Sequence, residues 1–159
     1  MRLKRFVGIA LTLATIATVS GCAIGFSANT SRQQPSGNGR YASADALEIR
    51  GATIVANPKD PSKGTLLVTI YNSGDTADAF TGITSNEVAG QPNKVIQLPV
   101  GQAVRIGFNS DVTFPLTSSN LLIPGNFVAL NLDFANSTSA EMKLLVNANT
   151  GIYAGVNIR

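Results

Sequence analysis

GTLLVTIYN, residues 64–72, is the stretch that decides the fold. Its side chains alternate between two largely apolar faces: Leu66, Val68 and Ile70 on one, Leu67, Thr69 and Tyr71 on the other. A strand that is apolar on both faces is typical of the middle of a sheet that is covered on both sides. We therefore expect these residues to form a central β-strand.

The rest of the chain supplies further strands with a clearer polarity. Residues 126–134 place four apolar side chains on one face, Val128, Leu130, Leu132 and Phe134, and polar side chains such as Asn131 and Asp133 on the other. This pattern predicts a strand with one buried face and one solvent-exposed face. Residues 102–108 and 140–146 alternate in the same way. Other predicted strands cover residues 47–55, 79–84 and 94–98. The turns between them are rich in Pro, Gly and Asn, so we predict an all-β fold, an antiparallel β-sandwich.

The first residues of the chain have the pattern of a secretory signal. Arg2, Lys4 and Arg5 precede an uncharged run of 14 residues, 6–19. This run is shorter than the roughly 20 apolar residues of a transmembrane helix, so a cleaved signal is the better interpretation. Small residues then lead to Cys22, as a lipoprotein signal peptidase requires. The alternatives are an ordinary signal peptide with a chance cysteine, or an uncleaved anchor.

Four segments are expected along the chain. Residues 1–21 are the signal peptide, and residues 22–44 are the lipidated Cys22 followed by a flexible tether rich in Ser, Gly, Asn and Gln. Residues 45–147 are the sandwich domain and residues 148–159 a C-terminal tail. The tail could add an edge strand, dock on a partner or fray. Two or more acyl chains on Cys22 would hold the protein stably on the outer face of the cytoplasmic membrane.

The composition excludes most reactive chemistry. Histidine and tryptophan are absent, methionine occurs only at positions 1 and 142, and Cys22 is the single cysteine. Catalytic triads and zinc or copper sites need such residues, so we expect neither an enzyme nor a cofactor. The signal carries three of the 12 basic residues and none of the nine acidic ones, so nine of each remain. A neutral mature chain predicts no nucleic-acid partner.

Carboxylates are the remaining candidates for chemistry. Asp75 and Asp78 lie in a turn that superficially resembles a calcium loop, but no glutamate closes a twelve-residue frame. An ordinary turn is the preferred interpretation. The other acidic side chains considered stand apart in sequence and are expected to be solvated at the surface: Glu48, Glu87, Asp111 and Asp133.

Three stretches together resemble a known family: LLVTIYNSGDTADAFTGITS at 66–85, LPVGQAVRIGF at 98–108 and LIPGNFVALNLDF at 122–134. Their order is similar to that of the periplasmic copper-chaperone domain PCu(A)C, a cupredoxin-like sandwich with Greek-key connections. The resemblance implies a copper site of two histidines and two methionines. The matching segments here, residues 85–93 and 109–115, contain neither residue type, so we expect the scaffold without the metal site.

The run at residues 68–85, ending in Gly82-Ile83-Thr84-Ser85, together with the cysteine motif and tether, also resembles the actinobacterial lipoprotein family LpqE. This resemblance implies an accessory subunit on the outer face of the respiratory cytochrome bcc-aa3 supercomplex. We therefore expect a membrane-anchored, non-catalytic interaction module whose contact residues the sequence does not identify. The alternatives are a copper metallochaperone and a carrier of a lipid or small molecule. Exposure of Phe80, Phe114 or residues 152–158 would be the first sign of a docking face.

Overall fold

Strand β3 (Lys63–Asn72) lies in the middle of a sheet, as its two apolar faces predict. In this computed structural model, which describes residues 38–158, β3 pairs on one side with β2 (Leu47–Ala56). On its other side it pairs with β7 (Ala103–Ile106) and β8 (Pro115–Ser118). All three pairings are antiparallel. Leu66, Val68 and Ile70 are buried on one face, whereas on the other face Leu67 is buried and Thr69 and Tyr71 are half-buried.

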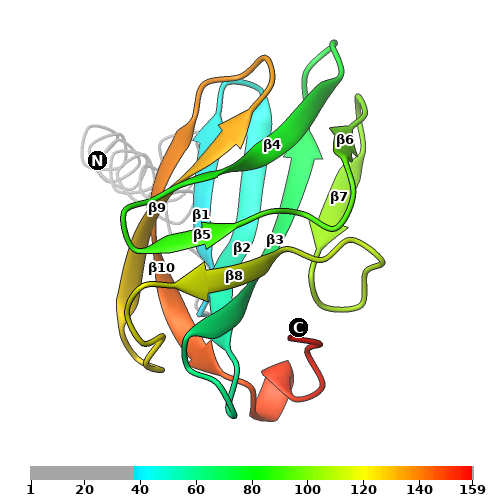
Figure 1. Ribbon diagram of the computed structural model, residues 1–159. Helices are drawn as coiled ribbons and strands as arrows, with labels where there is room; N and C mark the ends of the chain where they lie inside the picture. The colour runs from blue at the N-terminus through cyan, green and yellow to red at the C-terminus, as the bar shows by residue number, and fades with distance from the viewer. Residues whose placement is uncertain (1–37, 159) are drawn as a thin grey trace, which may run out of the picture. The chain divides into compact units, whose positions relative to one another are not determined.

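A second group of strands packs across the core from the first (Figure 1). It contains β9 (Phe127–Phe134), β10 (Ala140–Ala148), β4 (Asp78–Thr84) and β6 (Ile96–Leu98). Strand β10 joins the two groups, because its first residues pair with β9 and its last three pair with β2. The described residues thus form one strongly curled sheet. The predicted all-β sandwich is confirmed.

The β2–β10 pairing is parallel, a detail that the sequence did not predict. Val146, Asn147 and Ala148 lie opposite Ile54, Val55 and Ala56. A buried pair of polar side chains stabilises this junction: the Asn147 amide donates to the Thr53 hydroxyl at 2.6 Å, and that hydroxyl donates to the Leu145 carbonyl at 2.8 Å. The short parallel contact closes the sandwich along one side.

Strand β1 (Arg40–Ala44) corrects the predicted boundary between tether and domain. It pairs with β2 through four residues, Arg40, Ala42, Ser43 and Ala44, so residues 40–44 belong to the sandwich and not to the tether. Of the five residues only Ala44 is buried. A small, mostly exposed strand has almost no hydrophobic pattern, which is why the sequence did not reveal it.

Two more short strands lie outside the stretches that were predicted as strands. Strand β5 (Val88–Gly90) pairs with β8. Strand β8 begins at Pro115, a position where the missing amide hydrogen of proline is tolerated. The seven predicted strands are all present, and the described residues contain ten.

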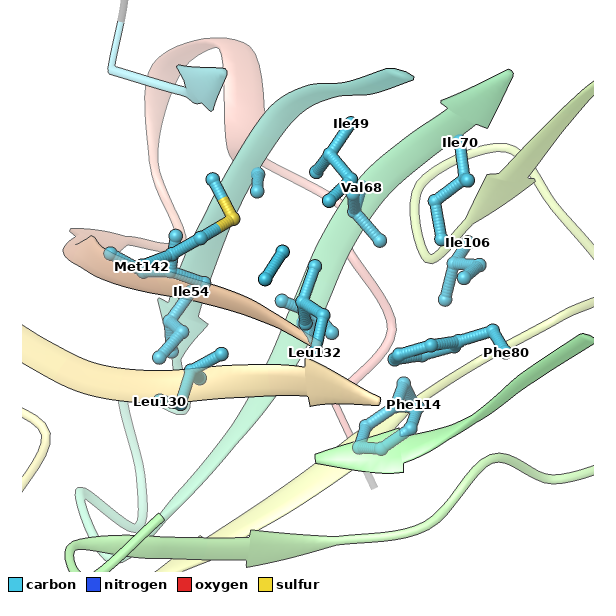
Figure 2. Close-up of a cluster of buried hydrophobic side chains, with 14 of the residues drawn as sticks. Ile49, Ile54, Val68, Ile70, Phe80, Ile106, Phe114, Leu130, Leu132 and Met142 are labelled. Carbon is cyan, nitrogen blue, oxygen red and sulfur yellow. The ribbon is translucent and has the colours of Figure 1, made fainter. Parts of the chain in front are cut away.

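The core lies between the two groups of strands and is centred on aromatic rings (Figure 2). The ring centroid of Phe80 lies 5.4 Å from that of Phe114 and 5.7 Å from that of Phe134. Phe80 and Phe114 are 2% and 0% exposed, so neither lies on a docking face. Met142 points into the same core from β10.

The C-terminal tail packs on its own domain. After β10 it forms a short 3₁₀ turn, η2 (Gly151–Tyr153), and then places Val156 against Val55 and Leu67 on the outer side of β2 and β3. Ile152, in contrast, is 76% exposed. The predicted signal peptide and Cys22 lie outside the described residues. Between residues 38 and 158, no helix is long and apolar enough to cross a membrane.

Candidate functional site

The two segments that the copper-chaperone resemblance singled out lie side by side. Residues 85–93 contact residues 109–115 through Asn93, whose side-chain amide donates to the Asp111 carbonyl at 3.0 Å. Its side-chain oxygen accepts from the Thr113 amide at 2.9 Å, and its own amide donates to the Thr113 carbonyl at 3.0 Å. The fold therefore brings together the places where the resemblance predicts a metal site.

The side chains at this place do not fit copper. Copper(I) prefers soft thioether, thiolate and imidazole donors, whereas these two segments contain only hydroxyl, amide, carboxylate and apolar side chains. The one thioether of the described residues, Met142, is 5% exposed in the core. Nor do the described residues bring three acidic, cysteine or histidine side chains together in a group that could hold a metal ion.

Asp78, one of the two calcium candidates, has a structural role instead. It is 6% exposed, and both oxygens of its carboxylate accept hydrogen bonds. Oδ1 accepts from the amides of Ala79 at 2.7 Å and Asn136 at 2.9 Å. Oδ2 accepts from the amide of Ser137 at 3.0 Å and from its hydroxyl at 2.7 Å. The carboxylate thus ties the β9–β10 turn to the start of β4.

The electrostatics of Asp78 follow from these contacts. Desolvation raises the pKa of the carboxyl, but the hydrogen bonds from Ser137, Ala79 and Asn136 outweigh it and leave the pKa below its ordinary value. Asp75, the second calcium candidate, is exposed. The turn between them is organised by Asn72, which is 1% exposed and donates to the carbonyls of Thr76 at 2.8 Å and Leu98 at 2.9 Å.

The four other acidic residues considered in the sequence are dispersed, as expected. Glu48 is paired with Arg50 on β2, and Asp111 is exposed. Glu87 is half-buried, and its carboxylate makes only a long contact of 3.5 Å with the Ala129 amide. Asp133 is less solvated than expected, because it accepts hydrogen bonds from the hydroxyls of Thr84 at 2.7 Å and Ser139 at 2.8 Å.

An apolar hollow of about 300 Å³ lies at the end of the sandwich where β2 and β10 finish and β9 begins. Its lining combines the β2–β3 loop, the β8–β9 loop and the residues after β10: Ala56, Asn57, Pro58, Pro61, Leu121, Leu122, Ile123, Pro124, Ala148, Asn149 and Thr150. Leu121 and Ile123 are 62% and 51% exposed, while Leu122 between them is buried. This pattern of two exposed residues around a buried one is a finding of the structure, which the sequence did not predict.

Polar groups surround the hollow without filling it. The side-chain nitrogen of Asn149 donates to the Val156 carbonyl at 3.1 Å. The side-chain oxygen of the same residue is buried and accepts no hydrogen bond. On the β2–β3 loop, Asp60 accepts from the Ser62 hydroxyl at 2.6 Å and lies 3.7 Å from the ammonium of Lys63. The hydrogen bond from Ser62 is the largest influence that holds the pKa of Asp60 below its ordinary value.

Comparison with solved structures supports the fold. The copper-bound PCuAC domain of PmoF2 is 18% identical, with a TM-score of 0.62 over 69% of this chain and 98% of that domain. The apo PmoF1 domain is 14% identical, with a TM-score of 0.59 over 69% and 99%. The apo PmoF2 domain is 17% identical, with a TM-score of 0.60 over 70% and 98%. No protein-family model and no curated protein matches the chain. The described domain therefore has a PCuAC-like fold.

Proposed function

We propose that this protein is a membrane-anchored, extracytoplasmic lipoprotein that acts as a non-catalytic accessory module. The observation that carries the proposal is the meeting of residues 85–93 and 109–115 in a PCuAC-like fold without a soft metal donor between them. In this proposal the fold of a PCuAC domain carries no copper(I) site, because residues 85–93 and 109–115 contain no thioether or imidazole and meet through the hydrogen bonds of Asn93.

The sequence supports the anchor. The charged start, the 14-residue uncharged run and the small residues before Cys22 are the pattern of a lipoprotein signal. In this proposal Cys22 is the only residue with a chemical role, and that role is attachment to the membrane. The resemblance to the LpqE family suggests the partner, the outer face of an actinobacterial cytochrome bcc-aa3 respiratory supercomplex.

Crosslinking mass spectrometry on intact membranes tests the accessory role, followed by affinity purification in a mild detergent. We expect reproducible crosslinks from the sandwich to one membrane complex and co-purification of that complex. The matched control carries Cys22→Ser behind an ordinary signal peptide, whose cleavage does not need a lipidated cysteine, so the domain is kept and the attachment is removed. We expect this variant to leave the membrane fraction and to lose the crosslinks. Recovery of the anchored protein alone under several crosslinkers would contradict the accessory role.

A copper-chaperone function is the second candidate, because the similar solved structures are PCuAC domains and one of them is copper-bound. A copper(I) competition titration of the apo protein decides between the two. We expect no stoichiometric binding tighter than micromolar, since the described residues contain a single, buried thioether. Met142→Leu is the control variant, because it removes that sulfur and keeps the volume of the core. Tight binding that Met142→Leu abolishes would restore the chaperone function.

A further inference from the structure

The end of the sandwich that contains the hollow is unusually apolar. Eight large hydrophobic side chains are exposed among the described residues, and four of them belong to the loops and strand start at this end: Leu121, Ile123, Phe127 and Ile152. Together with the hollow they make up what we call the apolar end. Apolar side chains that gather around a hollow, and are not scattered singly, mark a binding surface.

The chain enters the domain beside the apolar end. Asn38, the first described residue, lies next to Tyr153 of η2. The guanidinium of Arg40 lies over the ring of Phe127, 5.4 Å from its centroid. Strand β1 then runs away from this end, because it is antiparallel to β2, whose last residue, Ala56, lines the hollow. The segment that connects Cys22 to the domain therefore starts next to the exposed apolar side chains.

This segment is short. Only residues 23–37 separate Cys22 from Asn38, so the two residues can be no more than about 55 Å apart, the length of the fully extended chain. A lipid on Cys22 thus keeps the apolar end at a high local concentration near the membrane surface, where a weak second contact becomes effective. Two exposed cations lie on the same side of the domain. Lys59 follows Pro58, which lines the hollow, and Arg40 lies over the ring of Phe127. Such cations are attracted to anionic lipid headgroups.

We propose that the apolar end is a membrane-docking surface, which inserts Leu121, Ile123 and Ile152 into the boundary between headgroups and acyl chains of the bilayer. The proposal rests on the proposed lipid anchor at Cys22. It adds a second, non-covalent contact, which would orient the domain on a membrane to which the acyl chains of Cys22 already hold it. With the apolar end on the lipid, the opposite end of the sandwich, with the Pro99–Gln102 turn, points away from the membrane toward a neighbouring complex.

Site-specific fluorescence on the lipidated full chain tests this surface. Because acylated Cys22 has no free thiol, a new cysteine is the single labelling site. Ile123→Cys places an environment-sensitive nitrobenzoxadiazole probe at the apolar end, and Val100→Cys places it in the turn at the opposite end. The two positions are matched in exposure, at 51% and 44%. The protein is reconstituted into vesicles of phosphatidylcholine and phosphatidylglycerol that contain doxyl-labelled phospholipid.

We expect the probe at residue 123 to be blue-shifted and quenched several-fold more than the probe at residue 100. Adding Leu121→Ser and Ile152→Ser should reduce the quenching at residue 123, and both positions are exposed, so the fold is unaffected. Equal, weak quenching at both probes in protein that floats with the vesicles would overturn the docking surface and leave the anchor intact. Protein that does not float would overturn the anchor, and the docking proposal with it.

Discussion

Replacing Asp78 tests whether one buried carboxylate holds two distant parts of the sandwich together. Asp78→Ala leaves the amides of Asn136 and Ser137 and the Ser137 hydroxyl without their acceptor. A hydrogen bond to a charged group contributes about 1.5–3 kcal/mol, but water can reach part of this turn. We therefore expect the free energy of unfolding to fall by about 3 kcal/mol, and Asp78→Asn, which keeps one acceptor oxygen, to cost about half as much.

Urea unfolding at neutral pH measures this effect, and Asp75→Ala is the matched control. Asp75 lies in the same turn but is exposed, so its replacement should change the free energy of unfolding by less than about 0.5 kcal/mol. The reasoning would be refuted if Asp78→Ala were as mild as Asp75→Ala. It would also be refuted if Asp78→Ala and Asp78→Asn were equally destabilising, because the two retain different numbers of acceptors.

The pH dependence of the same variants provides an independent check. The folded pKa of Asp78 is below its unfolded value, so the carboxylate's contribution is fully present above the unfolded pKa and is lost as the pH falls through the folded pKa. The difference in stability between the wild type and Asp78→Asn should therefore shrink on acidification, below about pH 4. A difference that stayed constant over that range would show that the charge of Asp78 does not contribute.

Three further substitutions test the core and the loop contact. Phe114→Ala removes a fully buried ring whose centroid lies 5.4 Å from that of Phe80. Urea unfolding should show that the free energy of unfolding falls by about 3–5 kcal/mol. The control Phe108→Ala, at a partly exposed position, should lower it by less than about 1 kcal/mol. Gly90→Ala would place a methyl group 2.4 Å from the Pro115 carbonyl oxygen. Thermal unfolding should therefore show a loss of about 1–3 kcal/mol in the free energy of unfolding. An unchanged melting temperature would contradict the close approach of β5 and β8. Asn93→Ala removes two side-chain hydrogen bonds and should cost about 1–2 kcal/mol, with faster hydrogen exchange at the Thr113 amide; unchanged exchange there would contradict the contact between the two segments.

The sequence predicted strands wherever the hydrophobic alternation was long enough. Strands β3, β9 and β10 have seven or more residues of regular pattern, and their faces are as expected: Met142 and Leu144 are buried, and Lys143 between them is exposed. Strand β1 and the three-residue β5 lack such a pattern. They exist because a neighbouring strand offers backbone hydrogen bonds, which is a tertiary effect that local alternation does not encode.

The candidate sites were predicted less completely. Asp78 was recognised as a residue of interest, but its partners Asn136 and Ser137 lie 58 and 59 positions away, and nothing in their local sequence marks them. Residues 121–123 lie outside every predicted strand. That Leu121 and Ile123 point outward follows from the burial of Leu122 and from the position of the loop beside the ends of β2 and β10, which only the fold provides.

Strand β1 also determines how the domain responds to mechanical force. A pull on the N-terminal side of the domain, directed toward the end where β2 finishes, enters the sandwich at Asn38 and acts along β1. The hydrogen bonds to β2 lie perpendicular to that direction, so they are sheared together and are not opened one after another. Loading a ladder in shear distributes the force over all its bonds. A short strand with little buried surface can therefore resist a pull on the N-terminal side of the domain.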